Sequence, residues 1–406
     1  MKWDYEFDVV VVGGGPAGAT AANELAKQGK KVLLLDKAGR IKPCGGAIPP
    51  RAIKDYEIPD ELLVAKINCA RMISPKSEMV DIPIENGFVG MVDREDFDEW
   101  LRVRAQRSGA TRRIGSFSHV SRNNAESISE IHYLARDKVE DTQTTMKIVK
   151  TRYIIGADGA KSEVGRQEVP GAKLTKFVFA YHEIIEAPEE SKSKQKPDYD
   201  GKRCDVIYSG KYSPDFYSWV FPHGDRISVG TGSADKGFSL RKSVKDLKQK
   251  ICLTELKSIR CEGAPIPLKP LKKWDNGKDV VLAGDAAGVV APSSGEGIYY
   301  AMLGGELAAE AVIKSLNTND CRNLSLARKK FMKLHGKVFW ILGIMQWFWY
   351  RSDRLRERFV SICKDKDVQQ MTFESYMNKE LVKKKKKTQL RIFFKDLAHL
   401  LGIAKV

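Results

Sequence analysis

Short apolar runs separated by glycine turns dominate the first forty positions of the chain. Residues 8–12 (DVVVV) are mostly apolar and β-branched, and Gly13 closes the run, which predicts a buried parallel strand. Residues 16–28 carry a helical pattern that ends just before a glycine, and residues 31–36 (KVLLLD) form a second apolar run. Strand, helix and strand in this order predict a βαβ unit.

Further regular elements follow at wide intervals. Residues 95–107 hold apolar side chains at positions 97, 100, 101 and 105, a spacing that predicts a helix. Residues 153–155 and 280–282 are two more short apolar runs, and each leads directly into a Gly/Asp turn, as expected for strands of the same sheet. From about residue 300 onward the pattern becomes helical.

The middle of the chain has a different pattern of apolar and polar positions. Residues 176–276 alternate between apolar and polar positions and hold few helical patterns, and residues 191–202 read as a polar loop. This predicts a mostly antiparallel sheet domain inserted into a discontinuous α/β domain. The expected boundaries are 1–67, 91–172 and 277–330 for the α/β domain, 68–90 and 173–276 for the sheet domain, and 331–406 for a helical C-terminal region.

Composition narrows the classes of function. The formal net charge is +17 in 406 residues, which favours an acidic partner such as an anionic membrane, a nucleic acid or a phosphorylated ligand, although a solvated basic surface is the simple alternative. The seven cysteines are scattered without a CxxC pair, so we expect a reducing compartment and no zinc cluster or other metal site. We expect no secretory or transit peptide, and the apolar tract 338–350 is well short of the ~20 residues of a membrane span.

The glycine-rich turn after the first strand is a candidate phosphate site. Gly13, Gly15 and Gly18 fit the GxGxxG pattern, in which the glycines allow a tight turn, a close backbone approach to a pyrophosphate and close helix–strand packing. Asp36 ends the second strand, where a ribose-binding acid is expected, and its charge suits FAD or NAD better than NADP. A glycine turn without a ligand is the alternative, and the complete βαβ context disfavours it.

Three further stretches resemble the flavin-dependent monooxygenase and reductase superfamily. They are residues 92–101 (VDREDFDEWL), residues 156–159 (GADG) with Ser162, and residues 284–288 (GDAAG) followed by Pro292 and residues 295–297. The resemblance implies that Arg94 lies along the flavin nucleotide and that Asp285 holds ribityl hydroxyls. It also implies a helix whose N-terminus faces the flavin pyrimidine edge, where amide groups suit the charge of a reduced flavin.

The resemblance narrows at residues 217–222 (YSWVFP), which with Gly230 and Gly232 match the YxWxFP…GxG element of the geranylgeranyl reductases. Alternation along a strand places Tyr217, Trp219 and Phe221 on one face. Such a face could be ordinary core, but the resemblance implies the wall of an apolar channel for an isoprenoid chain. The loop KPCGGAIP at 42–49 and several other stretches are similar to those of the chlorophyll and bacteriochlorophyll geranylgeranyl reductases, and the likeness covers residues from about 5 to about 380.

This resemblance implies a fold and a set of cofactor contacts. The fold is an FAD-binding Rossmann-type domain of the glutathione-reductase and hydroxylase kind, with an inserted antiparallel-sheet substrate domain and a helical C-terminus. FAD is the implied cofactor and NADPH the implied co-substrate. The implied cofactor-binding residues are Gly13, Gly15, Pro16, Ala17, Gly18, Asp36, Lys37, Cys44, Gly45, Gly46, Arg94, Asp158, Gly284, Asp285, Gly295, Gly297 and Ile298.

Cys44 is the candidate catalytic residue. An isolated alkene accepts a hydride poorly unless a proton reaches its other carbon, and a cysteine thiol, ordinarily protonated at neutral pH, can supply that proton. Gly45 and Gly46 would let the backbone lie flat against a flavin. On physics alone a small hydrophobe that fills a gap is the favoured interpretation of Cys44, and the resemblance of the loop around it favours the catalytic or flavin-adjacent role instead.

The C-terminal segment offers a candidate membrane anchor. Five lysines at 383–387 precede residues 390–404, whose apolar positions fall on one helical face. Such a segment resembles an interfacial anchor on anionic lipid, at ~1 kcal/mol per basic residue, and the tract 338–350 adds apolar area. A helix packed on the body with a solvated charge run is the alternative.

Several functions remain compatible with these motifs. The leading hypothesis is an FAD-dependent reductase that saturates three of the four double bonds of a geranylgeranyl chain to give phytyl, on a bacteriochlorophyll or chlorophyll or as the free diphosphate, at the cytoplasmic side of a photosynthetic membrane. An archaeal-type lipid or quinone side chain is an alternative substrate, and a flavin monooxygenase or epoxidase is an alternative activity. A non-catalytic binder of membrane or nucleic acid is disfavoured, since no nucleic-acid module is visible and the flavin motifs would be unexplained.

Overall fold

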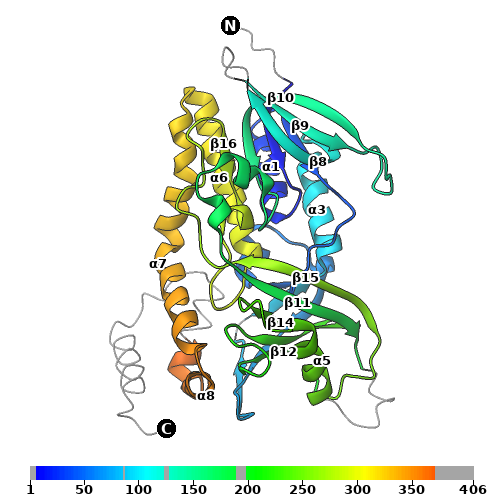
Figure 1. Ribbon diagram of the computed structural model, residues 1–406, viewed down its shortest axis with the longest axis vertical. Coiled ribbons are helices and arrows are strands. Elements are labelled where there is room, and N and C mark those ends of the chain that lie inside the picture. The colour runs from blue at the N-terminus through cyan, green and yellow to red at the C-terminus, as the bar shows by residue number, and fades with distance from the viewer. Residues whose placement is uncertain (1–5, 86, 123–127, 189–197, 371–406) are drawn as a thin grey trace. The chain divides into compact units, whose positions relative to one another are not determined.

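A computed structural model describes residues 6–85, 87–122, 128–188 and 198–370 (Figure 1). The described residues form two compact units, and the chain enters each of them three times. Unit 1 contains the described residues of the segments 1–42, 94–177 and 265–339. Unit 2 contains those of the segments 43–93, 178–264 and 340–406. The predicted tail segments 383–387 and 390–404 lie outside the described residues.

Unit 1 begins with the predicted βαβ unit. β1 (Phe7–Val12), α1 (Pro16–Lys27) and β2 (Val32–Asp36) follow one another, and the two strands pair in parallel with Val9 opposite Val32. The side chains of Val9 to Val11 are fully buried, as expected for a strand covered on both faces. The sequence prediction for residues 8–36 is therefore confirmed.

Two long strands extend this sheet. β8 (Thr111–Arg122) pairs in parallel with β2 through its first residues and antiparallel with β9 (Ser129–Ala135) through the rest. β10 (Thr145–Gly156) likewise pairs antiparallel with β9 and then parallel with β1 and with β16 (Val280–Leu282). Each long strand thus belongs to both the parallel part and the antiparallel part of the sheet.

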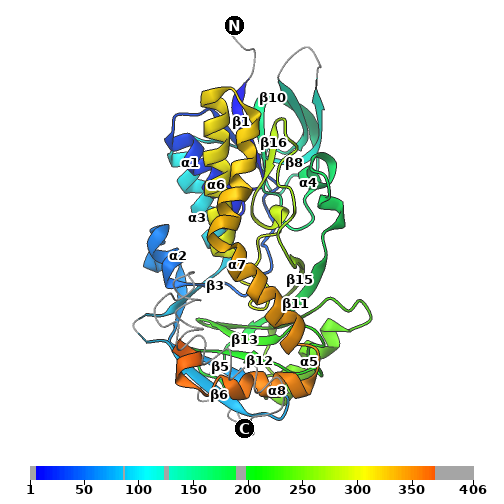
Figure 2. The same cartoon turned by 90° about the vertical axis from the view of Figure 1, so that its left-hand side faces the viewer.

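Helices cover the parallel part of the sheet in unit 1. α3 (Arg94–Arg107) and α6 (Ile298–Thr318) both contact α1, and Figure 2 shows α1 and α6 side by side. A Cβ atom at Gly305 would lie 2.1 Å from the carbonyl oxygen of Ala17, so glycine is required for this close helix pair. The remaining short elements of unit 1 are α4 (Glu163–Glu168) and the 3₁₀ helices Ala172–Leu174, Gly284–Ala287 and Cys321–Ser325.

Unit 2 is built on a seven-stranded sheet with the order β15-β11-β14-β13-β12-β5-β6. A three-stranded sheet of order β3-β7-β4 belongs to the same unit. The strands are β3 (Ala47–Ile48), β4 (Leu63–Ile67), β5 (Cys69–Ile73), β6 (Met79–Pro83), β7 (Val89–Val92), β11 (Phe177–Glu186), β12 (Arg203–Ile207), β13 (Ser218–His223), β14 (Arg226–Ser233) and β15 (Ser258–Pro267).

One feature of unit 2 corrects the sequence prediction, and a second adds detail to the mostly antiparallel sheet that was predicted. α5 (Leu240–Lys250) lies in the stretch expected to hold few helical patterns, and Val244 and Leu247 pack it on the sheet core. β12 and β5 pair in parallel within the otherwise antiparallel sheet. The remaining helices assigned to unit 2 are α2 (Pro50–Asp55), the 3₁₀ helix Asp60–Leu62 and α8 (Asp353–Ile362).

α7 (Leu326–Trp349) is the longest described helix, and its residues up to 339 belong to unit 1 while the rest belong to unit 2. The helical pattern predicted from about residue 300 is therefore confirmed as far as the description extends. Among the described residues, none of the helices combines the length and the apolar character that a membrane crossing requires.

Candidate functional site

The turn between β1 and α1 is held by the backbone of the neighbouring strand end. Gly13 has φ +106°, and a Cβ atom there would lie 2.3 Å from the carbonyl oxygen of Ala157, so only glycine fits. A Cβ atom at Gly15, by contrast, would meet no atom within 4 Å. The turn therefore packs tightly on the protein at Gly13 and leaves open space at Gly15, as a cradle for a pyrophosphate requires.

The first turn of α1 keeps backbone N–H groups available. Gly15 is the N-cap residue and provides no side-chain hydrogen bond, and Pro16 and Ala17 open the helix. A Cβ atom at Gly18 would lie 1.8 Å from the carbonyl oxygen of Gly13, so the turn and the helix are in direct contact. An uncapped helix N-terminus of this kind suits a phosphate group.

Asp36 links the end of β2 to the glycine turn. Its carboxylate accepts hydrogen bonds from the backbone N–H groups of Gly14 at 2.7 Å and of Ala38 at 2.9 Å. An ionised carboxylate has further lone pairs, so Asp36 can still accept from a ribose hydroxyl. Lys37 has an exposed side chain, and its carbonyl oxygen accepts from Arg136.

Arg102 is a residue of this region that the sequence did not reveal. Its guanidinium donates to the carbonyl oxygen of Gly14 at 3.2 Å and lies 4.0 Å from the Asp36 carboxylate. Glu99 in turn accepts from Arg102 at 2.9 Å. Helical spacing on α3 was the available signal, because it places Arg102 two turns beyond the predicted Arg94.

The GDAAG turn forms a second cluster in unit 1. Asp285 has a nearly buried side chain and forms an ion pair with Lys42, a partner that the sequence analysis did not identify. Gly284 has φ +63° and a Cβ atom there would lie 2.7 Å from the Cβ of Ala17, so the turn contacts α1 directly. Lys42 and Asp285 are distant in sequence, and only the folded chain brings them together.

The start of α6 lies just beyond this turn. Gly295 has φ +67°, Gly297 is the N-cap residue, and Ile298 is the first helical residue. The buried Glu296 accepts a hydrogen bond from the Tyr299 N–H at 3.0 Å. These contacts fix the N-terminus of the helix that the resemblance assigns to the flavin.

Two predicted cofactor residues make strong contacts within the protein. Arg94 is buried and donates two hydrogen bonds to Asp98, at 2.8 and 2.7 Å. Asp158 accepts from Ser162 and from the N–H groups of Glu163 and Val164, so its carboxylate caps α4. Burial raises the pKa of Asp158, although these hydrogen bonds oppose that shift.

The three predicted substrate residues form a continuous row in unit 2. The ring centroids of Tyr217 and Trp219 lie 6.0 Å apart, and those of Trp219 and Phe221 lie 6.2 Å apart. Trp219 and Phe221 lie two residues apart on β13, as predicted for one strand face, and Tyr217 immediately precedes this strand. The Trp219 indole donates to the Ser228 hydroxyl at 3.0 Å, and burial raises the pKa of the Tyr217 phenol.

The Cys44 loop belongs to the same unit. The Cys44 sulfur accepts a hydrogen bond from the Gly46 N–H at 3.4 Å, and after burial Cys44 is among the neighbours that raise the pKa of the Tyr217 phenol. A Cβ atom at Gly45 would lie 3.1 Å from the Phe221 ring. The structure thus brings the Cys44 loop next to the aromatic row, a contact between segments that are far apart in the sequence.

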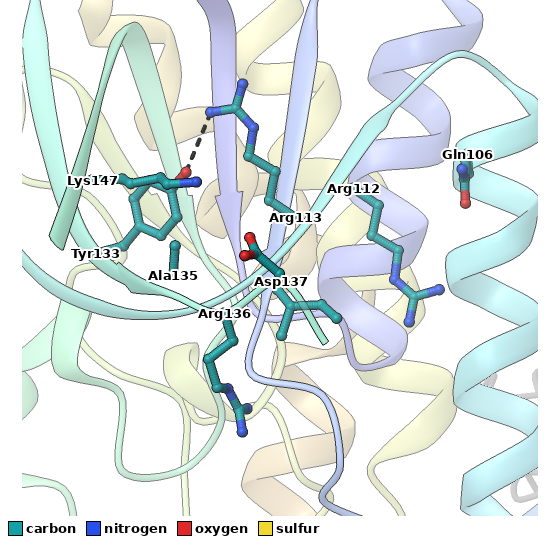
Figure 3. A pocket seen from close by; sticks show the side chains of 9 residues that line it. Gln106, Arg112, Arg113, Tyr133, Ala135, Arg136, Asp137 and Lys147 are labelled. Atoms are coloured by element: carbon teal, nitrogen blue, oxygen red, sulfur yellow. Dashed lines mark hydrogen bonds between the residues drawn. The ribbon is translucent and has the colours of Figure 1, made fainter. Parts of the chain in front are cut away.

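Unit 1 also carries a basic pocket of about 430 Å³ at the end of β8 and β9 (Figure 3). Arg113 donates to the Tyr133 hydroxyl at 3.3 Å within it, and Arg112 is paired with Glu99. Its charged lining residues are Arg112, Arg113, Arg136, Asp137 and Lys147. β8 pairs with β2 in this region, with Ile114 opposite Asp36.

The residues present fit a flavin dinucleotide. Gly15 leaves the open space that a pyrophosphate needs, the first turn of α1 is uncapped, and Asp36 keeps acceptor capacity for a ribose. Among the residues that the structure describes, no group of three or more His, Cys, Asp or Glu side chains is arranged to hold a metal ion.

Comparisons with known proteins agree with this site. The family model described as pyridine nucleotide-disulphide oxidoreductase matches residues 7–211. The chain is 58% identical to a geranylgeranyl diphosphate reductase of Rhodobacter capsulatus over 98% of both chains. It is 35% identical to a geranylgeranyl diphosphate reductase of Synechocystis over 97% of both chains.

A solved structure shows the same fold. A geranylgeranyl bacteriochlorophyll reductase-like protein from Thermoplasma acidophilum superposes with a TM-score of 0.76 at 23% identity, covering 94% of this chain and 99% of that one. This likeness confirms the predicted fold class, a flavin oxidoreductase fold with mixed sheets and C-terminal helices. The chain therefore belongs to the geranylgeranyl diphosphate reductase family and is a flavin oxidoreductase.

Proposed function

We propose that this protein reduces three of the four carbon–carbon double bonds of a geranylgeranyl chain to give phytyl in bacteriochlorophyll or chlorophyll biosynthesis. The chain would be carried by the pigment or by the free diphosphate. The observation that carries the proposal is the 58% identity to the Rhodobacter capsulatus reductase over 98% of both chains. The aromatic row of Tyr217, Trp219 and the partly buried Phe221 supports it, because an isoprenoid chain needs an apolar wall.

The residues of unit 1 would hold FAD. The turn at Gly13 to Gly18 and the first turn of α1 would bind the pyrophosphate, and Asp36 would accept from a ribose hydroxyl. Asp285 would accept from the ribityl chain, with Lys42 fixing its carboxylate. When bound, FAD takes a hydride from a reduced nicotinamide and supplies a hydride to one alkene carbon.

Cys44 would supply the proton for the second alkene carbon. The S–H bond breaks as the new C–H bond forms, and the resulting thiolate is protonated again from solvent. The Gly46 N–H bonded to the sulfur would stabilise that thiolate between the two events. The aromatic row beside Cys44 would align the alkene and keep water away from it.

Mass spectrometry of pigment tails tests the activity. Purified protein with FAD, NADPH and geranylgeranylated bacteriochlorophyll should give products two, four and six mass units heavier than the substrate. Cys44→Ala and Cys44→Ser should keep FAD and lose most of this reduction. Unimpaired reduction in both variants would exclude Cys44 as the proton donor.

The same assay separates the alternatives. Turnover without oxygen identifies a reductase, whereas a monooxygenase or epoxidase would stop. Parallel incubations with an archaeal-type diphytanyl-lipid precursor and with a polyprenyl quinone would show whether another isoprenoid is the preferred substrate. If no phytyl product forms from either the geranylgeranylated pigment or geranylgeranyl diphosphate, the proposed substrate class is wrong.

NADPH is the proposed hydride source, and the basic pocket of unit 1 is its proposed docking region. The pocket gathers Arg112 and Arg113 on β8, the strand beside Asp36, with Arg136 just after β9 and Lys147 on β10, and phosphate groups are the natural partners of such a surface. An Arg136→Gln, Lys147→Gln double variant should raise the KM for NADPH several-fold. A matched Lys173→Gln variant, on an exposed lysine outside the pocket, should leave KM unchanged.

We also propose peripheral association with the cytoplasmic face of an anionic photosynthetic membrane. On α7, Trp340 is 69% exposed, Ile344 is 44% exposed and Trp347 is 64% exposed, and their spacing of four and three residues places them on one helical face. Arg351 lies over the Trp347 ring at 4.6 Å, so a cation accompanies the aromatic surface. Exposed tryptophans next to basic groups suit the lipid headgroup region.

Liposome sedimentation tests this association. Binding to phosphatidylglycerol vesicles should exceed binding to phosphatidylcholine vesicles and fall with added salt. A Trp340→Ser, Trp347→Ser double variant should bind several-fold more weakly. Leu174→Ser is the matched control, since Leu174 is 82% exposed but lies elsewhere. Equal binding of the double variant and wild type would remove α7 from the proposal.

A further inference from the structure

His223, the last residue of β13, contacts two hydrogen-bond acceptors at once. Its side chain is 4% exposed. Its Nδ1 lies 3.1 Å from a carboxylate oxygen of Asp93, and its Nε2 lies 3.1 Å from the backbone carbonyl oxygen of Gly45. All three residues belong to unit 2.

Both partners of the imidazole can only accept. The carbonyl of Gly45 has no hydrogen to give, and the bond to His223 lowers the pKa of Asp93, which keeps that carboxylate ionised at neutral pH. Each ring nitrogen must then carry a hydrogen. The observed geometry is satisfied by the imidazolium form of His223, because a neutral ring has only one donor.

The second contact leads directly to Cys44. The carbonyl of Gly45 and the N–H of Gly46 belong to one peptide group. The carbonyl accepts from His223, and the N–H donates to the Cys44 sulfur at 3.4 Å. A cationic donor on the oxygen polarises the amide and strengthens the N–H as a donor. Asp93, His223, one peptide group and the sulfur thus form a continuous chain of hydrogen bonds.

Packing makes the same connection. Gly46 has φ +71°, and a Cβ atom there would lie 2.5 Å from the His223 ring and 2.5 Å from the carbonyl oxygen of Val92. The loop therefore lies directly on the imidazole. Only glycine permits this approach, so the position of the loop depends on the ring beneath it.

We propose that His223 is a positioning residue for Cys44: as an imidazolium held by Asp93 it fixes the Gly45–Gly46 peptide and thereby the orientation of the thiol. When His223 loses its proton, only one of its two hydrogen bonds can remain, and the Cys44 loop loses its anchor. This inference rests on the proposed function only for the purpose of the thiol, since the contacts themselves do not depend on the reaction.

Two further cations act on the Asp93 carboxylate. After the hydrogen bond from His223, the charges of Arg226, opposite His223 in the β13–β14 register, and of Arg260 on β15 also lower the pKa of Asp93. Arg226 has its own partner in Asp225 at 3.6 Å, and Arg260 is paired with Glu262. Of these described groups, Asp93 is the carboxylate whose oxygen lies within hydrogen-bond distance of the His223 ring.

Alkylation of Cys44 by N-ethylmaleimide, followed by peptide mass spectrometry from pH 5 to pH 9, tests the proposal without turnover. The measured quantity is the Cys44 rate divided by the rate of the exposed Cys252. Because His223→Gln removes the imidazole contacts that hold the Gly45–Gly46 peptide, this ratio should be at least fivefold higher in the variant than in wild type across the pH range. His182→Gln should reproduce the wild-type profile, because His182 is buried in the same sheet but bonded to Ser228 and Glu262.

Asp93→Asn provides a second variant if His223→Gln does not fold. Loss of the carboxylate removes one of the two contacts of the ring, so the ratio should rise in the same direction as in His223→Gln. Identical Cys44 ratios in wild type, His223→Gln and Asp93→Asn would overturn the proposal. A ratio that depends on His223, together with unimpaired alkene reduction by Cys44→Ala, would support the positioning role and reject the proton-donor role, so the two failures are distinguishable.

Discussion

Asp36 accepts a hydrogen bond from the Gly14 N–H at 2.7 Å, so the last residue of β2 holds the turn that follows β1. The two residues are brought together by the parallel pairing of their strands, in which Val12 lies opposite Leu35. The carboxylate therefore has two tasks, because the group expected to meet a ribose also fixes the turn expected to meet a pyrophosphate.

Asp36→Asn should weaken FAD binding by about tenfold or more, since a hydrogen bond to a charged group contributes about 1.5–3 kcal/mol. Flavin fluorescence titration of the apoprotein measures the Kd. Asp8→Asn is the control, because Asp8 accepts from the Lys31 N–H at 2.8 Å near the opposite end of the same strand pair. Equal affinities in the two variants would argue against a ribose contact.

Gly230→Ala should displace the Trp219 indole. A Cβ atom at Gly230 would lie 2.2 Å from the ring, and overpacking of this kind lowers the free energy of unfolding by about 1–3 kcal/mol. Urea denaturation measures the loss. Gly201→Ala, whose nearest new neighbour would lie 3.9 Å away, should match wild type. An equally stable Gly230→Ala protein would contradict the described ring position.

Asp279→Asn should destabilise unit 1 by about 2 kcal/mol at pH 7. Asp279 is 8% exposed and accepts from Arg122 at 2.8 Å, from Ser129 and from Asn276 at 2.8 Å, joining β8, β9 and the approach to β16. The asparagine cannot accept all of these bonds. Thermal and urea unfolding would measure the difference, and Asp320→Asn, in an exposed pair with Arg322, should behave as wild type.

The effect of Asp279→Asn on the free energy of unfolding should depend on pH. Burial raises the pKa of Asp279, but the hydrogen bonds from Arg122, Ser129 and Asn276 outweigh burial, so the pKa of Asp279 in the folded protein lies below its ordinary value. A carboxylate with a depressed folded pKa stabilises the protein above its unfolded pKa and loses that contribution as pH falls through the folded value. The stability gap between wild type and Asp279→Asn should therefore be full at pH 7 and shrink below about pH 4. A constant gap down to pH 2.5 would contradict the ion pair.

The cysteines should divide into two classes in a maleimide assay. Cys252 and Cys261 are exposed and should react in the native protein. Cys204 and Cys363 are buried, and burial raises the pKa of the Cys204 thiol, so both should react only after unfolding in urea. Native labelling of Cys204 at the rate of Cys252 would show that the core of unit 2 opens readily.

Local patterns were sufficient for much of unit 1. The β1–α1–β2 unit, α3 and the short strands at 153–155 and 280–282 all follow from apolar periodicity and from glycines whose conformations the backbone requires. α5 was missed because lysines dominate its sequence, and the few apolar residues that face the sheet, such as Val244 and Leu247, carry the signal alone.

The sequence does not predict which residues of distant segments come into contact. The residues around Lys42 do not indicate Asp285 as its partner, and those around His223 do not indicate Gly45, because each pair forms only when separate elements pack together. The family resemblance placed Cys44 near an apolar channel. It did not reveal the imidazole beneath the loop, which the geometry of Gly46 shows.

The contact of Gly305 with Ala17 has a consequence for how the protein is made. The face of α1 that contacts α6 stays uncovered on the ribosome until α6, nearly three hundred residues later, has emerged. Because such non-local contacts form slowly and leave apolar surface exposed, synthesis of this chain should depend on chaperones, and neither unit can be produced from a single continuous gene fragment.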